Sequence, residues 1–378
     1  YNRKSELLYQ DVEFLSSLAM FLGKEYPQQP INQGWETILL NQFHDIIPGS
    51  SIREVYEDSK KQYEEILNVG TELANKATNE IGAQIDLKER SVVAYNTLAF
   101  DRDDIVTFEV PDDIQYPCIV DDNGKILPCQ VIEKDGKRNA IFFAHGLPSK
   151  GYKAFALQDR KVDQDGKADY GTSMKVSPDY MENEFFSIKI DDKGTFASIF
   201  DKINKREVLK AGQRGNQIQA FEDKPMRYDN WDIDIYYQEK MWEVDDVEKI
   251  EVLENGPVRS GIRIQKKFMD STIIQSIYMY KDIPRIDFDT YIDWKEDDIL
   301  LKAAFPVDVH SYKATYEIQF GNVERPTHWN TSWDLARFEV CAHKWADLSE
   351  EGFGVSLLND CKYGHDIKDS VMRLTLLK

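Results

Sequence analysis

The sequence predicts a multi-domain α + β protein in which a three-helix bundle is followed by a small β domain and then by a large antiparallel β-sandwich. Apolar residues recur at helical spacing over the first 85 residues, and the period changes to that of strands at about residue 90. From about residue 178 onwards, every patterned segment is typical of β structure. We therefore expect domains at residues 1–85, 88–160 and 174–378, the last of them truncated at its C-terminus.

Three helices are expected in the first domain. The first carries an apolar stripe with helical spacing: Leu8, Val12, Leu15, Leu18 and Leu22. It should end before Pro27, because proline cannot continue a helix. The second stripe runs from Trp35 to Phe43 and should break at Pro48-Gly49. The third helix should begin at Ser51, whose spacing from Glu54 is that of a capping box.

Short strands separated by turn signals are expected in the rest of the chain. In the small domain they cover residues 92–94, 105–110, 141–143 and 152–157. The polar stretch 158–173 is the best candidate for a linker. In the large domain, strands 186–190 and 197–200 should form a hairpin, and further strands are expected at 258–268, 271–280, 285–291 and 314–320. Roughly ten or more strands with no helix between them predict a sandwich.

Composition restricts the partners and the compartment. With 67 acidic and 47 basic residues, the net charge of −20 argues against nucleic acid and anionic membranes as partners and fits a neutral ligand such as a sugar. No apolar run approaches the roughly 20 residues that span a bilayer. The four cysteines (Cys118, Cys129, Cys341 and Cys361) have no metal-binding spacing. Cys118 and Cys129 could pair across a hairpin, but sparse cysteines are more typical of reduced thiols, so we expect a cytoplasmic protein.

The most distinctive local feature is the segment from Asn41 to Ser51, Asn-Gln-Phe-His-Asp-Ile-Ile-Pro-Gly-Ser-Ser. It places His44 and Asp45 where an amphipathic helix meets a Pro-Gly turn, and imidazole is a common zinc ligand. Taken alone this signal is weak, because surface histidines and capping aspartates are common. One histidine cannot hold a metal, and neither H-x-D nor H-E-x-x-H occurs in the chain to complete a site.

This segment resembles the H-H-D-x-I-x-G-T segment of the α-mannosidases of glycoside hydrolase family 38. It is closest to the form in the bacterial and cytosolic branch, N-Q-F-H-D-I-x-P-G-S-S-I, and Phe43 stands where other branches carry an extra histidine. The resemblance implies that His44 coordinates the catalytic zinc ion and that Asp45 hydrogen-bonds the hydroxyls of bound mannose.

Further segments resemble the same family in the same order. They are Met181–Phe186, Gly194–Lys202, Arg206–Leu209, Tyr228–Asp234, Arg325–Val340, His343–Ser349 and Leu358–Gly364. The resemblance implies that the large sandwich is galactose-mutarotase-like. Asp229, Trp231 and Asp232 are then candidate sugar contacts, because flat apolar rings bind the C–H faces of sugars. The alternatives stay open: Trp231 as a core residue, the aspartates as turn caps, or the acidic stretch 222–248 as a solvated surface.

The resemblance further implies a retaining mechanism, which uses two carboxyl groups about 5–5.5 Å apart. In the family the nucleophile, the acid/base and the H-x-D ligands belong to an N-terminal β/α domain. The chain starts at Tyr1 without Met or a signal sequence, so we expect an interior fragment that lacks this domain and a parent protein that contains it. The parent should hydrolyse α-mannoside oligosaccharides with Zn²⁺, with Co²⁺ or another divalent ion as the alternative.

Other expectations concern the fragment itself. Its partners should be the glycan substrate, the missing β/α domain and, as this branch often assembles, a homo-oligomer. Alone, it should be inactive and should not retain zinc, because half a metal site has little affinity. Competing interpretations are a non-catalytic carbohydrate-binding module, a structural bracing unit, or a different glycosidase family that shares the sandwich. Roles for four further residues stay open: His328, His343, Trp329 and Trp333.

Overall fold

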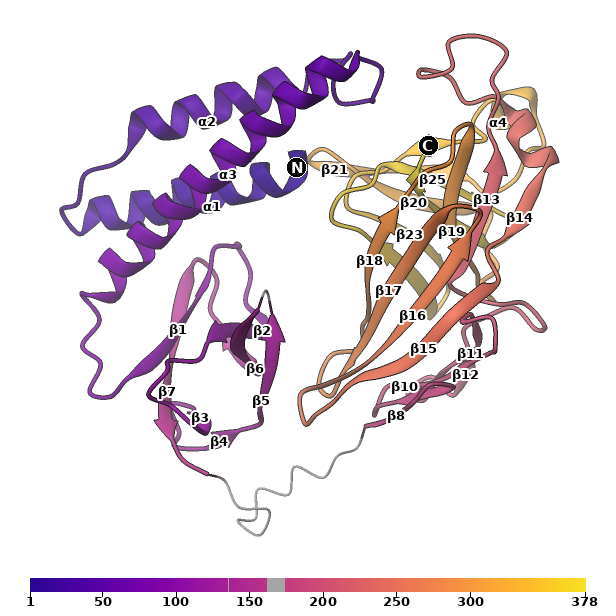
Figure 1. Cartoon of the computed structure of the whole chain (residues 1–378). Helices are drawn as coiled ribbons and strands as arrows, with labels where there is room; N and C mark the ends of the chain where they lie inside the picture. Colours follow the sequence, from indigo (N-terminus) through magenta and orange to yellow (C-terminus); the bar gives the residue numbers. More distant parts are fainter. Residues whose placement is uncertain (135, 162–173) are drawn as a thin grey trace. The chain divides into compact units, whose positions relative to one another are not determined.

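The computed structural model describes residues 1–134, 136–161 and 174–378. The chain folds into two compact units, residues 1–171 and 172–378, each of which can be followed by colour in Figure 1. The first unit begins with helices and continues in antiparallel strands, and the second is built almost entirely of antiparallel strands. The predicted fold class is therefore confirmed. Most of the linker expected at 158–173 lies outside the described residues, and the three domain boundaries stay predictions.

Three helices open the first unit: α1 (Asn2–Phe21), α2 (Gln28–Asn41) and α3 (Arg53–Gly82). Their shared core contains Tyr9, Ile38, Tyr63 and Ile66, all buried. The hydroxyl of Tyr9 donates a hydrogen bond to the carbonyl oxygen of Ile66, at 3.0 Å, which satisfies its only donor inside this core. The aromatic ring of Tyr9 lies directly over Gly34 of α2, where a Cβ atom would come within 1.9 Å of the ring.

The helix boundaries differ from the predictions in two places. α2 ends at Asn41, well before Pro48, and residues 42–52 form an irregular turn. α3 begins at Arg53 with Ile52 in the N-cap position and without a side-chain cap. The predicted Ser51–Glu54 capping box is therefore wrong, because the Ser51 hydroxyl bonds instead to a carbonyl within the turn. Leu22, expected in the apolar stripe, lies beyond α1 and is exposed.

The β part of the first unit consists of two sheets, with strand orders β1-β7-β3-β4 and β2-β6-β5. The strands are β1 (Ser91–Asn96), β2 (Arg102–Glu109), β3 (Pro117–Val120), β4 (Ile126–Leu127), β5 (Cys129–Lys134), β6 (Lys137–Leu147) and β7 (Gly151–Asp159). The four expected strands are found as β1, β2, β6 and β7. The pattern missed β3, β4 and β5, because strands this short carry too few residues to show an alternation. Phe142 and Phe155 pack edge to face between the sheets.

The β part supports the C-terminal end of the bundle. The hydroxyl of Tyr95 in β1 donates to the carbonyl oxygen of Thr78 in α3, at 3.0 Å. The Tyr95 ring packs against a cluster that contains Leu15, Ala19 and Ile81. This contact fixes the end of α3 that lies opposite the turn at residues 42–52.

The second unit contains four sheets, with strand orders β12-β11-β10-β9-β8, β14-β13-β19-β26-β25-β22, β15-β16-β17-β18 and β21-β20-β23-β24. The first strands are β8 (Lys175–Ser177), β9 (Tyr180–Glu182), β10 (Phe186–Ile190), β11 (Phe196–Asp201), β12 (Arg206–Glu207), β13 (Gln217–Glu222), β14 (Met241–Glu243), β15 (Asp246–Asn255), β16 (Arg259–Phe268) and β17 (Ser271–Tyr280). The others are β18 (Ile286–Asp293), β19 (Ile299–Pro306), β20 (Lys313–Ile318), β21 (Gly321–Pro326), β22 (Val340–Cys341), β23 (Trp345–Glu350), β24 (Phe353–Leu358), β25 (Gly364–Lys368) and β26 (Val371–Leu377).

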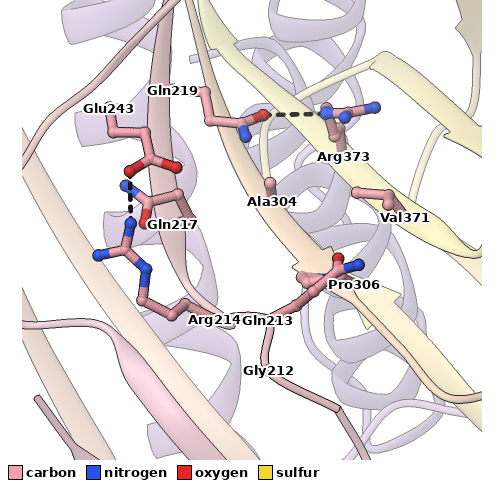
Figure 2. Close-up of a pocket in the computed structure, with 10 residues that line it drawn as sticks. All are labelled: Gly212, Gln213, Arg214, Gln217, Gln219, Glu243, Ala304, Pro306, Val371 and Arg373. Carbon is pink, nitrogen blue, oxygen red and sulfur yellow. Dashed lines mark hydrogen bonds and ion pairs between the residues drawn. The ribbon is translucent and has the colours of Figure 1, made fainter. Parts of the chain in front are cut away.

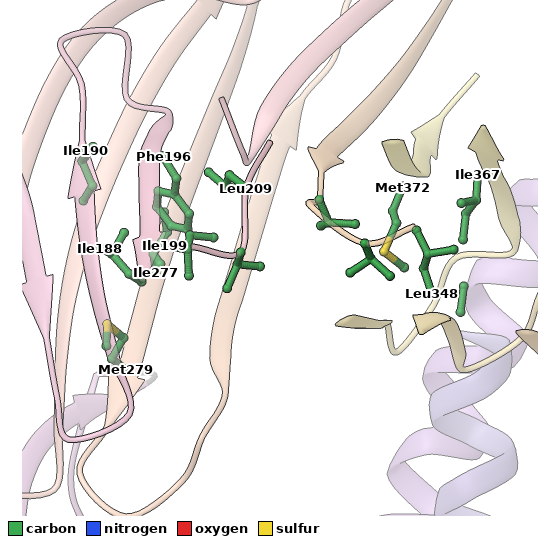
Figure 3. Close-up of a cluster of buried hydrophobic side chains, with 14 of the residues drawn as sticks. Ile188, Ile190, Phe196, Ile199, Leu209, Ile277, Met279, Leu348, Ile367 and Met372 are labelled. Atoms are coloured by element: carbon green, nitrogen blue, oxygen red, sulfur yellow. The ribbon is translucent and has the colours of Figure 1, made fainter. Parts of the chain in front are cut away.

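The core of the second unit joins all four sheets. Its largest cluster of buried side chains includes Phe196 of β11, Ile277 of β17, Leu348 of β23 and Met372 of β26 (Figure 3). The predicted hairpin is present, since β10 pairs antiparallel with β11 across a turn closed by Gly194 with a φ of +63°.

The expectation of no helix between the strands was wrong for two short segments, η1 (Ile235–Glu239), a 3₁₀ helix, and α4 (Ser332–Leu335). The hydroxyl of Thr331 accepts from the backbone N–H of Asp334 and the Asp334 carboxylate accepts from that of Thr331, which together form a capping box. A helix of one turn has no period for the sequence to reveal, so only its cap could have indicated it. No helix in the described residues is long and apolar enough to cross a bilayer. None of the four cysteines, all of them described residues, forms a disulfide.

Candidate functional site

The turn at residues 42–52 presents His44 and Asp45 at the end of α2. Its backbone closes on itself, since the N–H groups of Ile46 and Ile47 both donate to the carbonyl oxygen of Phe43, at 2.8 and 3.1 Å. Gly49 has a φ of +90°, a conformation that residues with a Cβ atom rarely adopt. The Pro-Gly signal therefore ends this turn rather than the helix before it.

Neighbouring amide side chains attach the turn to the other helices. The Nε2 of Gln42 donates to Oδ1 of Asn2, at 3.0 Å, and to Oε1 of Glu6, at 2.6 Å, both in α1. The Nδ2 of Asn41, which is 2% exposed, donates to Oε1 of Gln62 in α3, at 2.8 Å. Gln42 thus connects the start of the turn to α1, and Asn41 connects it to α3. Gln42 lies within the apolar stripe predicted from Trp35 to Phe43, and its positioning role was not anticipated from the sequence.

His44 and Asp45 lie together and face solvent. The Nε2 of His44 is 3.6 Å from Oδ2 of Asp45, and the two side chains are 71% and 48% exposed. The ring of Phe43 lies 4.3 Å from the imidazole, centroid to centroid, and limits its freedom on one side. An exposed imidazole beside a carboxylate can ligate a metal or exchange a proton, and both side chains remain accessible to solvent among the described residues.

A complete metal site is not present in the described part of the chain. No group of three or more His, Cys, Asp or Glu side chains is arranged there to hold an ion, whereas protein zinc sites use three or four protein ligands. The residues present therefore do not fit a self-contained zinc site. They fit one exposed ligand and one hydrogen-bonding carboxylate of a site that other polypeptide completes.

Asp229, Trp231 and Asp232 share a single turn in the second unit, after β13. The N–H groups of Trp231 and Asp232 both donate to the carbonyl oxygen of Tyr228, at 2.7 and 2.9 Å. The Trp231 side chain is 52% exposed, so it is not a core residue. The structure thus gathers these three predicted residues on one exposed turn, while His44 and Asp45 belong to the other unit.

The surroundings of this turn are acidic. Asp223, at the end of β13, is 2% exposed and lies 3.1 Å from the ammonium of Lys378. Burial raises the pKa of Asp223, Lys378 lowers it and the charge of Asp229 raises it further. A neutral ligand suits such a turn better than an anion, which the carboxylates would repel.

The other tryptophans and histidines of the matching segments have different surroundings. Trp333 is 76% exposed. The ammonium of Lys368 lies 3.4 Å from the centre of the Trp329 ring, a close cation–π contact. The Nδ1 of His328 is 3.7 Å from Asp334, and the ring of His343 packs edge-on against Tyr363. Both histidines therefore contact residues of the second unit.

One polar cluster was not anticipated. The six-stranded sheet is apolar on one face, but on the other Lys302 of β19 is fully buried and contacts Asp366 of β25 at 2.7 Å. Arg373 of β26 donates to the same carboxylate at 2.8 Å, and the hydroxyl of Tyr237 lies 3.0 Å from the Lys302 ammonium. The sequence signal was weak: Lys302 is a lone charged residue in the otherwise apolar strand Ile299–Pro306.

Two known protein families match this chain. Residues 181–378 match the family described as "Glycosyl hydrolases family 38 C-terminal domain", and residues 1–81 match "Alpha mannosidase middle domain". The first match alone spans more than half of the chain. The chain belongs to glycosyl hydrolase family 38.

Relatives of this family-38 chain carry mannosidase names. "Alpha-mannosidase 2C1" of Homo sapiens is 34% identical over 388 residues, which cover 100% of this chain and 34% of the relative. "Alpha-mannosidase G" of Dictyostelium discoideum is 32% identical over 418 residues, with 100% and 37% covered. The "Alpha-mannosidase" of Saccharomyces cerevisiae is 29% identical. The chain thus spans about a third of the length of these relatives.

A solved structure supports the family-38 fold. The crystal structure of an alpha-mannosidase from Enterococcus faecalis V583 aligns with all of this chain and 50% of its own, with a TM-score of 0.79 and 19% sequence identity. At this identity the likeness concerns the fold. It extends over both units, as the sequence resemblance predicted.

Proposed function

We propose that this chain is part of a retaining, zinc-dependent α-mannosidase that removes terminal α-mannose from oligosaccharides. The observation that carries the proposal is the match of the whole chain to relatives named alpha-mannosidases, together with an exposed His44–Asp45 pair on a braced turn. The two roles proposed are a metal ligand for His44 and an acceptor of mannose hydroxyl groups for Asp45.

The residues of this chain would help to hold the metal ion and to orient the sugar. The Nε2 of His44 would take one position on Zn²⁺, or on Co²⁺ or another divalent ion, which when bound supplies positive charge and a template for two sugar hydroxyls. The carboxylate of Asp45, 3.6 Å away, would accept hydrogen bonds from those hydroxyls. The bonds from Gln42 and Asn41 would keep the pair in place while substrate exchanges.

The second unit would add substrate contacts. Trp231 offers an exposed ring to the C–H face of a pyranose, and Asp229 and Asp232 offer carboxylates to its hydroxyls. The nucleophile and the acid/base, about 5–5.5 Å apart in a retaining enzyme, would come from polypeptide outside this chain. We accordingly expect the isolated chain to be inactive and to hold no metal tightly.

Compartment and assembly belong to the same proposal. The four described cysteines form no disulfide, Cys118 and Cys129 included, which supports a reducing compartment, the cytoplasm. The proposed partners are an α-mannoside oligosaccharide, the β/α catalytic domain and a second copy of the parent.

The test is substitution of His44 in a longer parent protein that contains this chain. His44→Ala is expected to lower the rate of p-nitrophenyl α-mannoside hydrolysis at least about 100-fold and to reduce the bound metal, since even supporting residues of metal sites matter by about 10–100-fold. His310 offers a matched control, because it is 81% exposed and lies 3.7 Å from Asp308. His310→Ala should keep full activity. Normal activity and metal content in His44→Ala would refute the assignment.

A bracing module or a non-catalytic carbohydrate-binding module is the competing function. Either would leave the parent's turnover insensitive to His44→Ala and Asp45→Asn. Loss of turnover in both variants, with unchanged thermal unfolding, therefore separates the proposed enzyme from both alternatives.

A further inference from the structure

A pocket of about 350 Å³ lies on the polar face of the six-stranded sheet in the second unit. Figure 2 shows how side chains of β13, β14, β19 and β26, and of the loop before β13, converge around it. Its volume is within the range of small-molecule sites, about 300–1,000 Å³. The pocket lies at the start of β13, whereas the turn with Trp231 follows the end of that strand, so the two features are separate.

The strand register explains why the pocket is polar. Gln217 and Gln219 of β13 point to the same face because side chains alternate along a strand. Gln217 pairs with Ala304 of β19, and Ala304 pairs with Arg373 of β26. Since Ala304 has only a methyl group, it leaves a space between the longer side chains on either side. The pocket is therefore a product of three neighbouring strands.

One acceptor in this pocket lacks a donor. Gln217 is 3% exposed, and its Nε2 donates to the carbonyl oxygen of Ile218, at 3.2 Å, and to Oδ1 of Asp245, at 3.3 Å. These two acceptors fix the orientation of the amide. Its Oε1 is then left without a hydrogen-bond partner among the described residues. Leaving a buried acceptor unpaired costs about 1–3 kcal/mol, so a ligand with a donor group would be stabilised here.

The positive charges of the two arginines in the pocket are already paired with carboxylates. Arg214 forms an ion pair with Glu243 and lies 3.6 Å from Asp245 and 3.9 Å from Asp191. Arg373 donates from Nη1 to Asp366, at 2.8 Å, and from Nε to Oε1 of Gln219, at 2.9 Å. Lys193 and Lys302 also pair with Asp245 and Asp366, so the positive and negative charges of this network balance. A bound anion would therefore meet no net positive charge. An anion also has no hydrogen to give to Gln217.

We propose that this pocket binds a neutral polyhydroxylated ligand of about the size of one pyranose unit. A hydroxyl group donates and accepts at once, so it can give its hydrogen to Gln217 Oε1 or Glu243 and accept from Arg373 or Gln219. This inference concerns a site other than His44–Asp45 and does not rest on the proposed mannosidase activity.

The test is direct binding to the chain of residues 1–378. Titration with methyl α-D-mannopyranoside, methyl β-D-glucopyranoside, myo-inositol and, as the anion, sulfate is followed by calorimetry and by saturation-transfer NMR. At least one of the three neutral ligands is expected to bind saturably, and sulfate is expected not to bind. Gln217→Met removes the acceptor at similar volume and should weaken binding about 3- to 10-fold, the value of one hydrogen bond. Ala304→Leu fills the space and should abolish binding.

Two control variants show whether the ligand binds in this pocket and not elsewhere on the chain. Gln265→Met, on an amide outside the pocket that bonds Glu248, and His44→Ala should both bind as the unsubstituted chain does. Thermal unfolding reports whether each variant folds, and Gln217→Met decides the outcome if Ala304→Leu does not fold. The proposal is overturned if no neutral ligand binds, if only sulfate binds, or if binding is unchanged in folded Gln217→Met. It is also overturned if His44→Ala abolishes binding.

Discussion

The hydroxyl of Tyr56, in the first turn of α3, donates a hydrogen bond to the carbonyl oxygen of Ile46 at 3.2 Å. The oxygen of this Tyr56 hydroxyl also accepts a hydrogen bond from the backbone N–H of Ser51, at 2.9 Å. One phenol thus joins both arms of the turn that presents His44. The turn keeps its shape through this contact, although the side chains of His44 and Asp45 face solvent.

Tyr56→Phe should loosen the turn without disturbing the bundle. The variant loses two hydrogen bonds, each worth about 0.5–1.5 kcal/mol, so the free energy of unfolding should fall by about 1–2 kcal/mol. Amide hydrogen exchange should accelerate mainly at residues 43–51. Tyr291, a 64% exposed residue of β18, serves as the control, because Tyr291→Phe removes a hydroxyl from the surface. Equal exchange in the two variants would contradict the role of Tyr56.

Gly34→Ala should destabilise the bundle although alanine favours helices. The added Cβ would lie 1.9 Å from Cε1 of the fully buried Tyr9. Overpacking of this kind costs about 1–3 kcal/mol, which exceeds the gain of about 1 kcal/mol from helix propensity. At Gly82, the last residue of α3, the nearest atom would be the Tyr95 hydroxyl at 3.6 Å, so Gly82→Ala should be neutral or stabilising. Urea unfolding of both variants measures the contrast, and stabilisation by Gly34→Ala would refute it.

Lys266 should make stability rise at alkaline pH. This lysine of β16 is 1% exposed, and burial lowers the pKa of its ammonium to about 8. In the unfolded chain the pKa of this lysine is 10.5. Between about pH 8 and pH 10.5 the unfolded chain therefore binds a proton that the folded chain has lost, and the free energy of unfolding increases with pH. The increase should approach about 3 kcal/mol. It should be absent in Lys266→Met, which should also be the more stable protein at pH 7.

The comparison for Lys266 is made against Lys189→Met, at an exposed position of β10. This control corrects for the loss of any lysine from the chain. A stability difference between Lys266→Met and the unsubstituted protein that stays constant from pH 7 to 10.5 would contradict the prediction.

Asp366→Asn should be strongly destabilising. Its carboxylate bonds both the fully buried ammonium of Lys302, at 2.7 Å, and the guanidinium of Arg373, at 2.8 Å. The Lys302 ammonium keeps Glu339 as a second carboxylate partner, so the cost is below the roughly 3–5 kcal/mol of an uncompensated buried charge. Loss of the two charged hydrogen bonds should lower the free energy of unfolding by about 2–4 kcal/mol. Glu324→Gln breaks an exposed pair with Lys313 at 2.8 Å and should leave the thermal midpoint unchanged. Similar midpoints for the two variants would show that the buried pair is dispensable.

The sequence revealed the elements whose residues repeat a pattern. The stripe of α1 and the alternation of β16 and β17 were predictable, because the period of side chains along a helix or strand follows from its backbone geometry alone. The His44–Asp45 pair and the segment around Trp231 became candidates because their segments resemble a family over many positions, and their roles stay predictions. Boundaries were less predictable: α2 ends at Asn41 although its apolar stripe continues to Phe43.

Only the tertiary structure decided what these residues contact. That Gln42 bonds α1 and Asn41 bonds α3 depends on helices that are distant in sequence. The polar pocket likewise needs β13, β19 and β26 side by side, strands separated by up to 154 residues at the Gln219–Arg373 bond. The physical reason is that a sequence period fixes which face a side chain occupies, whereas an unpaired acceptor such as Gln217 Oε1, or a buried charge such as Lys302, is defined by the neighbours that folding brings to it.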